Sequence, residues 1–354
     1  MKNIFAKLWD KKARSRTISY LLVIGFYLVM QIMSLTGNMS NMLQNLLIPV
    51  CCYIVAALAL NLTVGISGEL SLGQAGFMSI GAFTAVCVSG ALQNSITAEP
   101  VRLVIAIVIG AAFAALCGFL IGIPVLKLQG DYLAIVTLAF GQIIVNILNN
   151  VYLGVDSNGF QFSFIENKLK LAEGGKALIS GAMGATGTKK ISTFTAGIIL
   201  ILITLVIIYH LMYSRNGRAI MAARDNRIAA ESVGINIFRT KMLAFVVSSM
   251  LAGAAGALFA LNYATLLPAK FNFNTSILIL VYVVLGGLGN MTGTLISTTL
   301  LVVLPEMLRG LQDYRMLIYA VILIAIMLIT NNETLKLGFE KFLAKFKKKG
   351  AEKA

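Results

Sequence analysis

The sequence predicts an all-α, polytopic membrane protein with about ten transmembrane helices. Of its 354 residues, 58% are hydrophobic and only 12% are charged, and the mean hydropathy is +0.87. Soluble domains are about 25% charged, so this chain has too little polar surface to cover a soluble core. Its apolar runs are long and continuous, as membrane-spanning helices require, and do not alternate in polarity like the strands of a membrane β-barrel.

Ten apolar runs have a length compatible with a span, which needs about 17–25 residues. Two of them, Phe77–Ala91 and Thr275–Leu288, are short and contain glycine, so each could be half a span or a re-entrant segment. In chain order, the ten runs are Ser19–Leu35, Leu43–Leu62, Phe77–Ala91, Val101–Val125, Tyr132–Leu148, Thr193–Tyr213, Met242–Ala264, Thr275–Leu288, Thr292–Leu308 and Tyr314–Thr330.

The basic residues predict how these spans are oriented. If ten spans alternate from an inside N-terminus, 20 of the 29 Lys and Arg residues fall inside, as the positive-inside rule requires. The transmembrane domain is then 18–330, with both termini cytoplasmic. Eight spans would also keep both termini inside, but they would move the basic loop 214–241 outside, so ten spans are favoured.

Three segments lie outside the predicted spans. The N-terminal tail 1–17 has the charges of a signal peptide, but no convincing small-x-small cleavage site follows, which favours a retained first helix. The outside loop 153–191 is polar and rich in glycine, and we expect a mobile surface segment or an extracellular lip. The basic C-terminal tail 331–354 could form an amphipathic helix on the inner leaflet or remain solvated.

Composition argues against several classes of protein. The net charge of +15 arises mainly from residues that flank apolar runs, which favours contact with anionic lipid over nucleic acid. Four cysteines without ligand spacing and the single His210 predict no metal site and no catalytic residue. The chain has no phosphate-binding Gly-x-x-x-x-Gly-Lys-Ser/Thr loop, so any ATP hydrolysis belongs to another chain. Asp131 and Glu306 lie at span ends, which argues against an ion-coupled transporter.

The basic loop 214–241 is predicted to dock another protein. One short helix would run from Arg218 to Ala223, and a second would be capped by Asp225 or Asn226 and end at Gly234. Helices this short are marginal alone, and two adjacent alanines would leave a flat face for a partner. The alternative is an ordinary loop whose charge only sets topology. The predicted docking residues are Arg218, Arg224, Asp225, Asn226, Ala229, Ala230, Glu231 and Gly234.

Two glycine-rich segments, 61–81 and 286–293, interrupt the spans in the two halves of the chain. Irregular backbone at membrane depth must be covered by protein or line a cavity, and paired interruptions of this kind point to a substrate path. Close helix packing is the alternative, and it is favoured for Ala75, Gly76 and Gly81. The predicted path residues are Gly65, Gly68, Glu69, Ser71, Gln74, Gly286, Gly287, Gly289 and Asn290.

Four stretches carry a resemblance to a known family: Leu60–Phe77, Gly130–Gly141, Gly217–Ile235 and Leu285–Thr294. Together they are similar to the permease subunit of branched-chain amino acid ABC importers, the LivM type. Two departures stand out: Gln142 occupies a position where such permeases often carry Glu, and the loop 160–190 lacks clear family motifs.

The resemblance implies a type II ABC importer-like permease in the bacterial cytoplasmic (inner) membrane. It implies a sister permease subunit in a homo- or heterodimer, two ATP-binding subunits that hold ATP and Mg, and an extracytoplasmic solute-binding protein. The loop containing Ala229, Ala230 and Gly234 would insert into a groove on the ATPase. The implied solutes are Leu, Ile and Val; urea, short amides and other amino acids are the alternatives.

Overall fold

The computed structural model describes residues 11–36, 41–93, 96–128, 130–156, 159–164, 176–308 and 314–331. They form two compact units, residues 1–298 and 299–354, and helix α12 passes from the first unit into the second. Most of the N-terminal tail, part of the loop 153–191 and nearly all of the C-terminal tail lie outside the described residues, so the predictions made for those tails remain predictions.

A helix lies over each of the ten predicted spans, which confirms a polytopic helical membrane protein. Among the described residues, seven helices, α2 to α7 and α10, are long and apolar enough to cross a membrane, whereas α11 and α12 are shorter. The number of crossings therefore remains a prediction. The bounds are α2 Lys11–Leu35, α3 Asn41–Asn61, α4 Gln74–Ala91, α5 Glu99–Val125, α6 Asp131–Asn149, α7 Phe194–Tyr213, α10 Ile237–Ala260, α11 Phe273–Gly286, α12 Met291–Met307 and α13 Arg315–Asn331.

Helices α3, α4 and α10 form the core of the first unit. Their apolar segments are 89%, 67% and 78% buried, whereas those of α2, α5 and α6 are only 11%, 22% and 28% buried and leave apolar faces for lipid or other subunits. A Cβ at Gly81 would overlap the backbone of Gly253, and one at Gly76 would lie 2.7 Å from the Cα of Gly141. The packing interpretation of these glycines is thus confirmed, because small residues let the helices approach closely.

The loop after α6 contains strands in addition to the helices that the sequence predicted. Strands β1 (Val151–Asp156), β2 (Gly159–Phe164) and β3 (Lys176–Ser180) form an antiparallel sheet in the order β2-β1-β3. Strand β4 (Ala185–Thr186) pairs with β5 (Thr265–Leu266). Pairing satisfies backbone groups that an irregular loop would leave to water. The alternating aromatics in Gly159–Phe164 were the signal for a strand.

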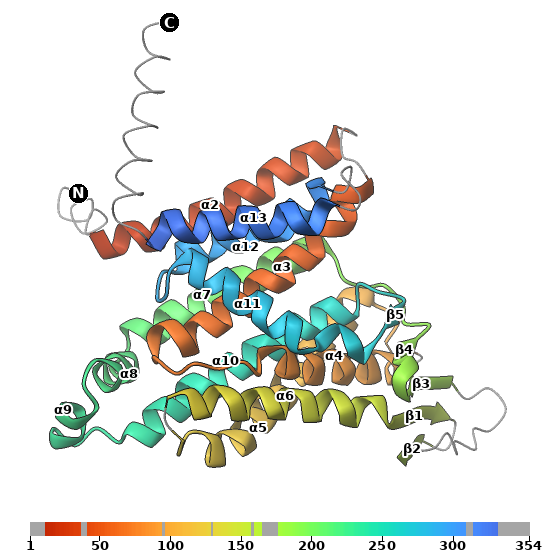
Figure 1. The fold of residues 1–354 in the computed structure, drawn as a ribbon. Coiled ribbons are helices and arrows are strands. Elements are labelled where there is room, and N and C mark those ends of the chain that lie inside the picture. Colours follow the sequence, from red (N-terminus) through yellow and green to blue (C-terminus); the bar gives the residue numbers. More distant parts are fainter. Residues whose placement is uncertain are drawn as a thin grey trace, which may run out of the picture. The chain divides into compact units, whose positions relative to one another are not determined.

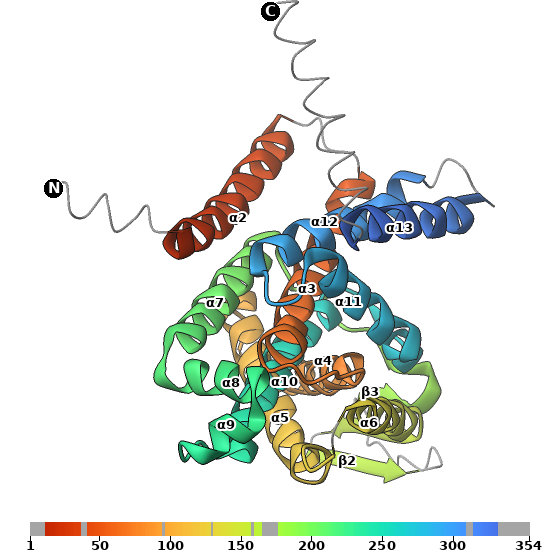
Figure 2. The same ribbon diagram turned by 60° about the vertical axis from the view of Figure 1, so that its left-hand side comes forward.

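The loop 214–241 folds into two further helices, α8 (Arg215–Asp225) and α9 (Arg227–Ser232). Within the first unit, α8 and α9 lie at one end of the helices and the sheet β1–β3 lies at the opposite end (Figure 1). The rotated view in Figure 2 keeps the same separation, with α8 and α9 below α7 and the sheet beside α6. This arrangement agrees with the predicted placement of the two loops on opposite sides of a membrane.

Candidate coupling site

Side-chain caps define both helices of the loop. The hydroxyl of Ser214 accepts a hydrogen bond from the amide of Gly217 at 3.1 Å, so α8 begins three residues earlier than predicted. The side-chain oxygen of Asn226 accepts from the amide of Ala229 at 3.0 Å, and Gly234 adopts a φ of +83° just after α9. The predicted cap and the predicted left-handed glycine are confirmed. Of the two candidate caps, the structure selects Asn226.

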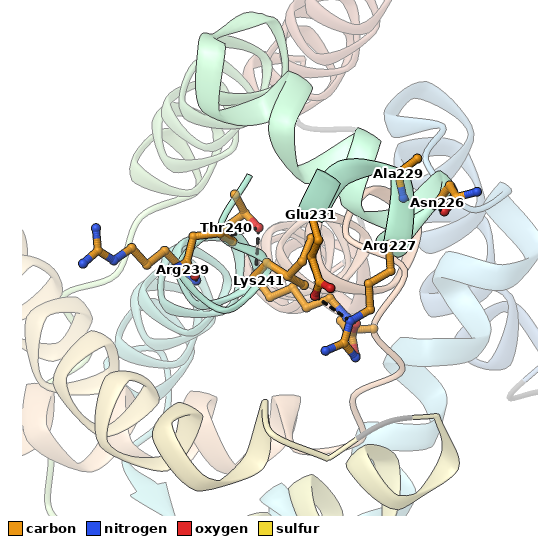
Figure 3. A network of polar contacts seen from close by, with 10 residues as sticks. Asn226, Arg227, Ala229, Glu231, Arg239, Thr240 and Lys241 are labelled. Carbon is orange, nitrogen blue, oxygen red and sulfur yellow. Dashed lines mark hydrogen bonds and ion pairs between the residues drawn. The ribbon is translucent and has the colours of Figure 1, made fainter. Parts of the chain in front are cut away.

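Asp225, the other candidate cap, is held by its neighbour. Arg224 donates two hydrogen bonds to one oxygen of the Asp225 carboxylate, from Nε at 2.9 Å and from Nη2 at 2.8 Å. Arg218 donates to the carbonyl of Tyr213 at 3.1 Å, which fixes it at the junction of α7 and α8. Arg227 and Glu231 pair at 3.1 Å across one turn of α9 (Figure 3). Both members of that pair are about half exposed, so the pair adds little stability.

A small apolar cluster joins α8 and α9 to the start of α10. It consists of Ala223, Ala230 and Ile237, with Ala222 and Ile235 packed against them. Because Ala230 is only 3% exposed, it supports the loop from within. The prediction that both adjacent alanines form the exposed face is therefore wrong for Ala230.

The outward surface of the loop carries larger apolar side chains than predicted. Ile228 is 81% exposed and Val233 is 75% exposed, and they flank the exposed Ala229. The branched apolar side chains in this basic loop were a signal of an exposed apolar surface, which the sequence analysis did not use. A surface of this kind is typical of a protein contact.

Arg224 connects this loop to the first glycine-rich segment. Its Nη1 donates to the carbonyl of Gly65 at 2.9 Å. Gly65 lies in a π-helical turn, Leu62–Ile66, that extends α3. Gly68 follows with a φ of +75°, and a Cβ there would lie 2.6 Å from Cγ of Arg224. The arginine thus caps the interrupted helix end, and Gly68 leaves room for its stem.

A buried ion pair makes a second connection. The ammonium of Lys241, in α10, pairs with the carboxylate of Glu69. The two side chains are only 16% and 11% exposed, so each charge depends on the other. Helices α8 and α10, which lie on either side of α9 in the chain, therefore both contact the first glycine-rich segment. Helix α8 does so through Arg224 and α10 through Lys241. Glu69 was predicted from the sequence to be a path residue, but its pairing with Lys241 was not predicted.

The two glycine-rich segments contact each other. A Cβ at Gly65 would overlap the amide of Gly289. Asn61 bridges the segments, because its side-chain oxygen accepts from the Gly289 amide at 2.8 Å and its Nδ2 donates to Thr294 Oγ1 at 2.8 Å. Asn61 was not among the predicted path residues, although a polar amide within an apolar span is a signal of function.

The remaining predicted residues of the second segment shape its turn. Gly287 and Gly289 have φ values of +90° and +79° between α11 and α12, and a Cβ at Gly286 would lie 2.5 Å from the backbone of Thr294. The side-chain oxygen of Asn290 accepts from the amide of Gly293 at 3.2 Å. Asn290 therefore acts as a helix cap.

Polar side chains of the first segment fall into two groups. Gln74 donates from Nε2 to the carbonyl of Ala56 at 3.3 Å, so its amide ties α4 to α3. Thr63, Ser67 and Ser71 are each 2% exposed, and their hydroxyls lack a hydrogen-bond partner within the described part of the chain. Buried polar groups usually have a partner. These three hydroxyls are therefore buried polar groups whose partners do not lie within the described part of the chain.

Comparison with known proteins identifies the family. A family model described as "Branched-chain amino acid transport system / permease component" matches residues 42–329. The high-affinity branched-chain amino acid transport system permease protein LivM of Escherichia coli (strain K12) is 36% identical over 287 residues, which cover 78% of this chain and 66% of LivM. The chain thus spans just under two thirds of that relative's length.

Other relatives extend this similarity. The fructose import permease protein FruG of Bifidobacterium longum (strain NCC 2705) is 28% identical over 212 residues, covering 59% of this chain and 56% of FruG. The permease protein LivH of Salmonella typhimurium is 26% identical over 179 residues, covering 47% and 58%. No solved structure matches the chain. From the match over residues 42–329, the chain belongs to the family of permease components of branched-chain amino acid transport systems.

Proposed function

We propose that this chain is the membrane-spanning permease subunit of an ATP-binding-cassette importer, and that it moves branched-chain amino acids inward across the bacterial cytoplasmic membrane. Two ATP-binding subunits would hydrolyse ATP with Mg, a sister permease would complete the path, and an extracytoplasmic binding protein would deliver the solute. Family membership and the sequence similarity to both LivM and LivH support this proposal.

One observation carries the proposal: the loop that offers a docking surface also contacts the first glycine-rich segment. Ile228 and Val233 are exposed on the surface, while Arg224 and Lys241 reach the first segment. A movement imposed on α8 and α9 by a partner would therefore displace the backbone around Gly65. Because Asn61 joins that segment to the second one, the displacement would reach both sides of the path.

Local polarity supports this assignment of the path. The hydroxyls of Thr63, Ser67 and Ser71, which have no partner among the described residues, would accept hydrogen bonds from the ammonium of an amino acid or donate to its carboxylate. The aliphatic surroundings suit the side chains of Leu, Ile and Val. The same features would admit other small solutes, so uptake of labelled leucine is to be compared with uptake of urea, short amides and other amino acids.

Docking is tested with substitutions on the exposed surface. Ala229→Arg and Ile228→Glu change side chains that face outward and are expected to reduce co-purification of the ATP-binding subunits and ATP-driven uptake. Gly234→Pro is expected to do the same, because proline cannot adopt a φ of +83°.

A matched control is Met183→Glu, which places the same charge on a 67% exposed residue at the opposite end of the first unit. Co-purification should be unchanged in this variant. If Ala229→Arg and Ile228→Glu retain normal co-purification and ATP-driven uptake at normal expression, the docking assignment is wrong.

A further inference from the structure

A cavity lies between α2 and α7, away from the coupling site. Its volume is about 760 Å³, and its wall includes Arg16 and Tyr20 from α2 and Tyr209, His210 and Tyr213 from α7. The two helices run antiparallel, since Tyr20 lies 6.0 Å from Tyr209 at one end and Tyr27 lies 5.7 Å from Phe194 at the other. The start of α2 and the end of α7 thus border the same cavity.

Charge identifies the membrane side on which this cavity opens. Arg16 belongs to the basic N-terminal stretch, and α7 leads directly into the basic helix α8. The start of α2 and the end of α7 therefore both lie beside the positive charge expected on the cytoplasmic side. Arg16 and His210 are exposed at the cavity and offer donors to an anion. The three tyrosines have the amphipathic character typical of residues at the level of lipid headgroups.

The apolar part of the cavity is formed by Leu21 and Ile24 from α2 and Val206 from α7. Leu21 lines the first cavity and also a second one of about 530 Å³, whose wall includes Leu22, Phe26 and Val29. From Arg16 to Val29 the helix rises about 20 Å. One leaflet of the hydrocarbon core is about 15 Å thick. The first cavity therefore offers a charged end at headgroup level beside an apolar wall, and the exposed apolar surface of α2 continues beyond it for about the length of an acyl chain.

From this geometry we propose that the α2–α7 groove binds an anionic phospholipid of the cytoplasmic leaflet. The phosphate group would accept hydrogen bonds from Arg16 and His210, and an acyl chain would lie along Leu21. Basic pockets between membrane helices on the cytoplasmic side suit anionic headgroups in this way. The proposal does not depend on which solute the permease moves or on how its ATP-binding subunits dock.

The test measures which lipids the full-length chain retains. The protein is reconstituted in nanodiscs of phosphatidylcholine and phosphatidylglycerol, extracted in mild detergent, and examined by native mass spectrometry. The wild-type chain is expected to enrich phosphatidylglycerol over phosphatidylcholine. Arg16→Gln should lower the apparent affinity for phosphatidylglycerol about fivefold, adding His210→Gln should lower it further, and Arg16→Lys should retain most of it.

Two variants separate the groove from general surface charge. Arg239→Gln removes one exposed positive charge that is not in the groove wall, and should leave enrichment unchanged. Val206→Trp fills the apolar part of the first cavity, and should displace the lipid although every charge remains. Equal retention of both lipids by the wild-type chain would overturn the proposal. So would an equal loss in Arg16→Gln and Arg239→Gln, or unchanged retention in Arg16→Gln.

Discussion

The two glycine-rich segments look alike in sequence but differ in what holds them. The first, around Gly65, receives a charge-assisted hydrogen bond from Arg224 and an ion pair from Lys241. The second, around Gly289, is bonded to the first segment through Asn61. Both adopt backbone conformations that favour glycine, with φ values of +75° at Gly68 and +79° at Gly289.

This difference indicates the order in which a movement of the loop would reach the two segments. The loop 214–241 contacts the first segment directly, and the first segment contacts the second. Charged contacts act at the end of the helices that carries α8 and α9, where their exposed parts can be hydrated, whereas neutral amide contacts act where charges would be costly. Substitutions that break the charged contacts should therefore separate docking from transport, and substitutions at the junction of the segments should disturb the path itself.

The largest effect is expected from Lys241→Met, which leaves the Glu69 carboxylate buried without its partner. Breaking a buried ion pair costs about 3–5 kcal/mol, and the slight exposure of this pair places the expected loss near the lower limit. The apparent unfolding temperature of the purified chain should fall, and ATP-driven uptake in vesicles should be lost.

The double variant Glu69→Gln/Lys241→Met provides the control. It removes both charges, so stability should recover although the connection between α10 and the first segment is weakened. Exchange of the two charges, in Glu69→Lys/Lys241→Glu, should recover part of the uptake as well. An unfolding temperature in Lys241→Met equal to that of the wild-type chain would show that the pair does not stabilise the fold.

The next largest effect is expected from Gly65→Ala, which tests the junction between the two segments. The added methyl group would overlap the backbone of Gly289, and crowding of this kind costs about 1–3 kcal/mol. Thermal unfolding and uptake should both be impaired. Gly141→Ala is the matched control, because its nearest neighbouring atom would lie at an ordinary 3.6 Å; equal behaviour of the two variants would contradict the close approach.

The sequence predicted the helices and the loop well because their signals are local. Apolar length located ten helices, and the spacing of Asn226 and Gly234 located the ends of α9. The contacts of Glu69 and Arg224 could not be predicted in the same way. They join residues more than 150 positions apart in the chain, and hydrophobicity does not specify which helices become neighbours.

The corrections have the same physical origin. Ala230 looked like a surface residue because alanine fits both a flat docking face and a small core, and only the packing of Ala223 and Ile237 decides between them. The strands after α6 were missed because glycine and polar residues dominate that loop. Backbone pairing between distant parts of the loop, such as Tyr152 with Ser180, leaves a weak signal in composition.

A smaller effect is expected from Arg224→Gln, which removes the charged donor to the Gly65 carbonyl. The side chain is 38% exposed, so the expected loss of stability is only about 1 kcal/mol. Uptake should fall while the ATP-binding subunits still co-purify, because the docking surface is intact. Arg239→Gln removes an exposed charge from the same loop without removing this contact, and should leave stability unchanged. Parallel loss of co-purification and uptake in Arg224→Gln would argue for a docking role instead.

The smallest effect is expected from Asn226→Ala, which removes the cap of α9. Loss of such a cap costs about 0.5–2 kcal/mol, and a six-residue helix has few bonds of its own with which to resist fraying. Amide hydrogen exchange should therefore increase within α9 while exchange in α3 and α4 stays the same. Asn226→Asp keeps an acceptor at the same position and should restore protection. If exchange in α9 is unaffected by the loss of the cap, its order comes from the Ala223–Ala230–Ile237 cluster, and the docking surface depends on packing against α10 more than on its own hydrogen bonds.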